Sequence, residues 1–247
     1  MHAARSNAVA QRVEDQGDPQ AWLRASPLID LDDSRLRLRV LALTQLCRTD
    51  TRRAMAVYGY VKTLPFGQPE RYGVKTARQV LDDGRGGWHA KTTLFIAMLR
   101  VAGLPARLRV LALPGSTLRG LVDTRFPFLL PVAEFCIDGC WLGTDTHILD
   151  PRAMSLVRLE LVRRGWGRGF GVHRNGAPLW DGRHDAFAAF SPHRPDGQVL
   201  EDFGVHGDIA EFIRDLRRRS PHRWALHMAH YRAIKPRLRQ AMNRLLG

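Results

Sequence analysis

The sequence predicts an α+β fold in which a buried central helix packs on a small antiparallel sheet. Residues 92–99 contain no charged side chain, so a helix in this position must be buried on nearly all sides. An alternating segment at 106–112 follows, and then two strand-like segments joined by Asp138-Gly139, a dipeptide typical of tight hairpin turns. Helical segments before and after this core complete the predicted architecture.

The N-terminal part is predicted to be a flexible arm followed by helices. Residues 1–28 are polar and aperiodic, and we expect them to be loosely held. A helix is expected from Asp32-Asp33-Ser34, because apolar residues then recur at spacings of four and three. A second helix is expected after Thr51, and a short third one over 77–81.

The core domain is expected to span residues 29–212. Gly86-Gly87 marks the beginning of the central helix, and Gly103, followed by a proline two residues later, marks its end. The strands that follow are predicted at 106–112, 130–137 and 140–144. A helix over 153–164 and a glycine-rich loop over 165–182 complete the domain.

The tail at 213–247 carries most of the positive charge. The chain of 247 residues has 38 Lys and Arg residues against 24 Asp and Glu residues, a net charge of +14. Ten of these bases and only one acid lie between 213 and 247, so this segment alone carries +9. Apolar residues from Trp224 to Leu245 form a helical stripe along it, and Pro236 predicts a kink or a break.

Two interpretations of this basic amphipathic tail remain open. It is either a helix packed on the domain with a solvated arginine face, or a surface that binds an acidic protein, a membrane or nucleic acid. The residues expected to make the second kind of contact are Arg217, Arg218, Arg219 and Arg223.

Composition and motifs exclude several other classes of protein. With 45% hydrophobic and 25% charged residues, the chain is too apolar for a disordered protein. We expect no spanning helix, no signal peptide and, with three cysteines, a reducing cytoplasmic setting. No CxxC or HExxH motif is present, and His222, His227 and His230 fit surface residues better than ligands, so we expect no metal and no cofactor.

Several anchors along the chain resemble the transglutaminase-like superfamily, whose core has the papain-type cysteine-protease arrangement. In that family a glycine-containing segment opens a buried helix, and the sequence MLRVAGLPAR at 98–107 resembles the phrase that closes it. Lys91, Glu134, Trp141 and Asp145 follow the family's register, and a WDGRHDAF segment begins at Trp180. The chain is therefore similar to a divergent bacterial-type member over about residues 30–210.

The same resemblance indicates that two catalytic groups are missing. It places Trp88 where the family has its cysteine and Leu130 where the family has its histidine, and it retains only Asp145. In the family, a thiol at a helix N-terminus attacks an acyl carbonyl, while the aspartate orients the histidine. An indole and an isobutyl group can perform neither role, so we expect no conventional thiol catalysis.

Polar residues near this altered centre leave other roles open. His89 and His147 are candidate acid–base groups beside Asp145, although each also fits an ordinary polar residue at a helix start or strand end. Lys91 is expected to pair with Glu134 or with the aspartate as a structural remnant.

Two functions from different classes follow from this pattern. The first is a pseudoenzyme or binding module that holds a small molecule or peptide in a residual cleft. That cleft would be lined by Trp88, Lys91, Leu130 and Glu134. The indole there either fills the old site or offers a flat platform for a ligand. The alternative is a repurposed non-thiol enzyme that acts on a small acyl, amide or natural-product-like substrate through Asp145, His147 and His89.

Overall fold

The N-terminal helices of the chain begin where polar side chains can cap them. The computed structural model describes residues 17–67, 74–191 and 199–247. Asp33, Thr49 and Thr76 each accept a hydrogen bond from a backbone amide of the helix that follows. The elements formed are a 3-10 helix at Pro19–Leu23, α2 (Ser34–Thr44), α3 (Asp50–Thr63), α4 (Ala77–Asp83) and α5 (Trp88–Val101). The expected arm at 1–28 therefore includes one short helix, and its residues 1–16 lie outside the described part.

Helix α5 is the central helix that the charge-free segment predicts. Every residue from Lys91 to Arg100 is buried, and the helix ends at Gly103 with a φ of +80°. The buried arginine of this helix, Arg100, donates hydrogen bonds to the carbonyls of Arg24, Ala106 and Gly207. A charge can lie inside the core here because each nitrogen of the guanidinium donates a hydrogen bond to a backbone oxygen.

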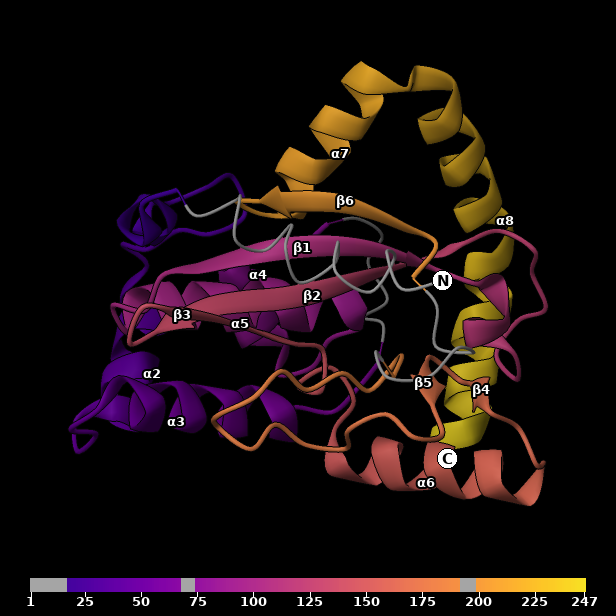
Figure 1. Cartoon of the computed structure of the whole chain (residues 1–247), viewed down its shortest axis with the longest axis horizontal. Coiled ribbons are helices and arrows are strands. Elements are labelled where there is room, and N and C mark those ends of the chain that lie inside the picture. The colour runs from indigo at the N-terminus through magenta and orange to yellow at the C-terminus, as the bar shows by residue number, and fades with distance from the viewer. Residues whose placement is uncertain (1–16, 68–73, 192–198) are drawn as a thin grey trace, which may run out of the picture.

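Helix α5 packs on a four-stranded antiparallel sheet with the order β3-β2-β1-β6 (Figure 1). The strands are β1 (Ala106–Leu113), β2 (Phe128–Ile137), β3 (Cys140–Thr144) and β6 (Glu201–His206). The turn between β2 and β3 places Asp138 and Gly139 at φ values of 50° and 79°, as the predicted hairpin requires. The predicted α+β class, with one buried helix on a small antiparallel sheet, is confirmed.

Alternation along β2 decides which residues face the central helix. Phe135 lies edge-on to Phe95 of α5, with ring centroids 5.7 Å apart. Since successive strand residues point to opposite faces, Glu134 must lie on the face turned away from α5. Leu130 and Phe128 share this side of β2 with Glu134, but they lie nearer the beginning of the strand, where they pack in the same cluster as Trp88.

A second group of elements closes the other end of the sheet. It contains α6 (Pro151–Arg163) and the short strands β4 (Arg168–Gly169) and β5 (Val172–His173), which lie within the segment expected to be a loop. No helix among the described residues is long and apolar enough to cross a membrane.

The basic tail forms two helices, α7 (Ile209–Arg219) and α8 (Pro221–Leu246), that meet in an elbow (Figure 1). The break lies at Ser220, whereas α8 continues through Pro236, so the expected division of the helix is at the wrong residue. Pro236 removes the donor for the carbonyl of Arg232, and both residues are exposed, so water can satisfy that carbonyl. Leu238 and Met242 are buried against the domain.

Candidate functional site

Trp88 fills the position at which the resemblance places the family's thiol. It is the first residue of α5 and is only 6% exposed. Its ring meets the rings of Phe66 and Phe128 edge-on, with centroids 4.8 and 5.5 Å away. Gly171 closes another side, because a Cβ added there would come within 3.0 Å of the indole. The indole is therefore a packed core residue and does not offer a platform to a ligand.

Asp145 holds backbone amides and has no histidine to orient. Its carboxylate accepts hydrogen bonds of 2.5 Å from the amide of Ala188 and 3.0 Å from that of Ala189. Burial raises the pKa of this carboxyl to about 6. The residue thus fastens the segment after the WDGRHDAF motif to the end of β3.

His147 is buried in a separate set of contacts. Its Nε2 lies 3.0 Å from the hydroxyl of Thr92, and its ring lies 4.7 Å from that of Phe95. Nδ1 is buried without a hydrogen-bond partner in the described part of the chain. Burial holds the pKa of the imidazole well below its usual range, and the nearby Lys91 and Lys62 lower it further. His147 shares no hydrogen bond with Asp145, so the two do not form a dyad.

Lys91 is fully buried and donates to backbone carbonyls at the C-terminus of α3. Its Nζ lies 2.7 Å from the carbonyl oxygen of Leu64 and 3.4 Å from that of Lys62. Burial lowers the pKa of Lys91 to about 7, although Asp150 acts in the opposite direction. The expected pairing of Lys91 with Glu134 or Asp145 is wrong, because helix-end carbonyls take that place.

Glu134 lies in a buried ion-pair network near the end of β2. Its carboxylate oxygens are 2.9 Å from Nε of Arg107 and 3.1 Å from a terminal nitrogen of Arg109. The Arg107 guanidinium also lies 4.0 Å from the ring centroid of Trp141. Glu134 is therefore not part of a cleft at Trp88, whereas Leu130 is buried in the same apolar cluster as that indole.

His89 is half-buried beside the tail. Its Nδ1 is buried without a hydrogen-bond partner among the described residues. Burial lowers the pKa of His89 to about 4, and the nearby His227 of α8 lowers it further. His89 is therefore a neutral residue at the junction of α5 and α8, separate from Asp145 and His147.

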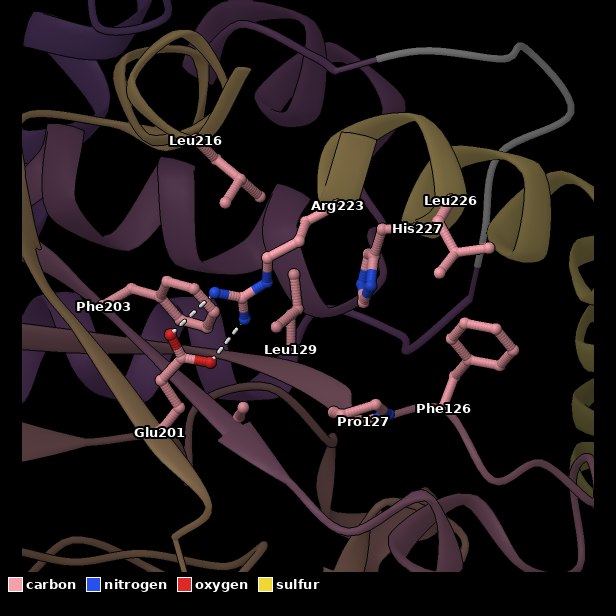
Figure 2. A pocket seen from close by; sticks show the side chains of 10 residues that line it. Phe126, Pro127, Leu129, Glu201, Phe203, Leu216, Arg223, Leu226 and His227 are labelled. Carbon is pink, nitrogen blue, oxygen red and sulfur yellow. Dashed lines mark hydrogen bonds and ion pairs between the residues drawn. The ribbon is translucent and has the colours of Figure 1, made fainter. Parts of the chain in front are cut away.

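An open groove lies between the sheet edge and the elbow of α7 and α8 (Figure 2). Its volume is about 260 Å³, and its walls are mostly apolar. Its polar side chains are His227 and an ion pair in which the Arg223 guanidinium reaches Glu201 at 2.6 and 3.2 Å. The apolar lining consists of Ala112, Phe126, Pro127, Leu129, Phe203, Leu216 and Leu226.

Comparison with known proteins finds a family model and solved structures that resemble part of the chain. Residues 39–145 match the model of the transglutaminase-like superfamily. Among curated proteins, none matches the chain.

Two solved structures are similar to this chain, at 17% identity each. One is a candidate cysteine protease from Cytophaga hutchinsonii, with a TM-score of 0.42 and coverage of 53% of this chain and 43% of that one. The other is a candidate protease from Parabacteroides distasonis, with a TM-score of 0.36 and coverage of 51% and 24%. The match thus spans less than half the length of either relative.

The transglutaminase-like core brings some of the expected site residues together and separates others. Trp88, Lys91, Asp145 and His147 lie around the first half of α5 and the end of β3, whereas Glu134 lies in the ion-pair network near the end of β2. The sequence analysis did not predict the groove, although it named one of the lining residues, Arg223, as a contact for a partner. The walls of the groove come from four segments that are distant in the sequence, around residues 112, 126–129, 201–203 and 216–227, so no local pattern predicts it.

Proposed function

We propose that this protein is a transglutaminase-like binding module without thiol-dependent catalysis. The observation that carries the proposal is the burial of Trp88 at the N-terminus of α5, between Phe66 and Phe128. An enzyme of this superfamily needs an ionisable thiol at that helix end and room for an acyl group beside it. Here an indole occupies both the position and the space.

The other polar residues near this position serve the fold. The carboxylate of Asp145 and the amine of Lys91 bond to backbone groups, and His147 is fully buried. A group that transfers a proton must reach the substrate within about 3 Å, directly or through one water molecule. Their burial supports binding over non-thiol catalysis.

The groove under the elbow is the place where we expect a ligand. Its volume of about 260 Å³ fits a small apolar molecule, and its walls are mostly apolar with a few polar groups. Trp88 fills the residual cleft expected at its position, so we place the ligand in the groove instead. His227 and Arg223 would orient a polar end of the molecule.

Two measurements test this proposal. Wild-type protein and a variant with Cys47, Cys136 and Cys140 replaced by serine are assayed for incorporation of a fluorescent amine into casein and for casein cleavage. Neither protein should show turnover. Turnover by the wild type that is lost in the cysteine-free variant, or in Asp145→Asn or His89→Ala, would contradict the proposal.

Binding is measured with the apolar fluorescent probe 8-anilinonaphthalene-1-sulfonate. Leu226 lines the groove and is 58% exposed, while Leu159 of α6 is 63% exposed outside it, so the two form a matched pair. Leu226→Asp should weaken probe binding on the order of tenfold, since a charge in an apolar site is costly. Leu159→Asp should leave it unchanged, and equal effects of the two substitutions would overturn the assignment of the groove.

A further inference from the structure

The outer surface of the tail carries positive charge without acidic interruption. Helix α8 has 26 residues and contains no Asp or Glu. At 1.5 Å per residue it is about 39 Å long. The acids of α7 are Glu211 in its first turn and Asp215, and Asp215 lies 3.1 and 2.9 Å from Arg218 and Arg219, whose side chains remain 77% and 70% exposed. Surface helices usually mix charges of both signs, so this pattern is unusual.

The apolar face of α8 is occupied by the domain. Leu238 and Met242 are buried, and Ile234 packs beside them. Higher up the helix, His230 lies 2.8 Å from the hydroxyl of Thr124 and stacks on Phe126 with ring centroids 4.0 Å apart. The apolar stripe is therefore unavailable for insertion into a lipid surface unless α8 leaves the domain.

Arginines flank a narrow strip of small residues on the exposed side of α8. With 3.6 residues per turn, Arg237 and Arg244 fall on one flank of the helix, and Arg232 falls on the other. None of these three has a carboxylate partner among the described residues. The strip between them consists of Ala225, Ala229 and Ala233, which are all exposed. Small side chains there let a polyanion approach the helix backbone while arginines contact it from both sides.

We propose that the outer face of α7 and α8 binds the phosphate backbone of double-stranded nucleic acid without reading its sequence. A long uninterrupted cationic face suits a regular array of phosphates. Single strands require exposed aromatic rings for stacking, and no aromatic ring in the described tail is fully exposed, since Trp224 and Tyr231 are half-buried and Phe212 is buried. The same lack of aromatic anchors disfavours an acidic protein partner.

The test compares two triple variants that lose the same charge. One replaces Arg232, Arg237 and Arg244 on α8 by glutamine. The control replaces Arg37, Arg48 and Arg52, which are exposed on α2, on α3 and in the turn between them, at the other end of the molecule (Figure 1). Binding to a fluorescein-labelled 20-base-pair DNA duplex is followed by anisotropy between about 50 and 200 mM salt, the range over which phosphate contacts are screened.

The full chain should bind the duplex with an affinity that falls steeply with salt. In the α8 variant, the plot of log association constant against log salt concentration should be less steep by about 3, and binding should be about tenfold weaker or more. The control should change the slope by less than about 1. Circular dichroism checks that both variants keep their helices. An independent second variant replaces Arg217, Arg218 and Arg219 by glutamine.

Three outcomes would overturn the proposal. Equal losses in the two triple variants would show attraction by net charge alone. Tighter binding to vesicles containing phosphatidylserine than to the duplex at the same salt would point to a membrane. A single strand of equal length that binds as tightly as the duplex would show that duplex geometry is not recognised.

Discussion

Charged and titratable groups are treated in opposite ways at the N-terminus of α5 and on the tail. Around α5, burial lowers the pKa of Lys62 to about 8 and that of Lys91 to about 7, and raises that of Asp145 to about 6. Each shift favours the neutral form. On α7, by contrast, the side chains of Arg218 and Arg219 extend into water and pair with Asp215.

This difference shows that a polar side chain near the N-terminus of α5 need not be chemically available. The amine of Lys62 donates to the carbonyls of Thr146 and Pro178, at 2.7 and 3.1 Å, as that of Lys91 does to α3. Such amines satisfy backbone carbonyls that would otherwise lack a hydrogen-bond donor in the interior. The charges that can meet a partner lie on the tail, where the domain packs only the apolar side of the helix.

The substitution that should disturb the buried region most is Trp88→Ala. We expect the free energy of unfolding to fall by about 3–5 kcal/mol, because the indole leaves a cavity between two phenyl rings. Urea denaturation measures the change. Trp224→Ala, at a half-buried position of the tail, is the control and should cost less. Equal losses at the two positions would contradict the assignment of Trp88 to the core.

The next largest effect concerns pH. An unfolded lysine keeps its proton up to about its ordinary pKa of 10.5, whereas folded Lys91 loses it near 7. Between these values the unfolded state binds more protons, so stability should rise with pH by about 1.4 kcal/mol per unit for this lysine. Lys62 should add a similar rise above about pH 8.

Lys91→Met should remove part of this dependence. Urea titrations at several pH values between 7 and 10 measure it, and a substitution of the exposed Arg48 by methionine is the control. A wild-type protein whose stability falls over this range would show that Lys91 remains charged in the folded state.

The smallest effect is expected at the rim of the groove. The Arg223 and Glu201 side chains are 49% and 42% exposed, so water screens their ion pair. Arg223→Gln should cost at most about 1 kcal/mol in urea denaturation. A loss above about 2 kcal/mol would mean that the tail depends on this pair, and the contrast with the buried region would weaken.

Local patterns predicted most of the fold. The charge-free run of α5, the cap at Asp33 and the hairpin at Asp138-Gly139 are each encoded within a few residues. The tail was recognised by its apolar stripe, although its break lies at Ser220 and not at Pro236.

The site was less predictable because it depends on which face of an element meets which neighbour. Alternation showed that Leu130 and Glu134 share a strand face, but not that Phe135 faces α5. For the same reason the carbonyl partners of Lys91 were missed: they come from the end of α3, some 27 residues away in the chain.

The contact between Gly171 and Trp88 constrains how the two positions can change. Gly171 has a φ of +86°, and any side chain there would meet the indole. A smaller residue at position 88 would leave an empty volume, and a larger residue at 171 to fill it would be strained. Neither substitution is favourable without the other, so the glycine and the tryptophan constrain each other.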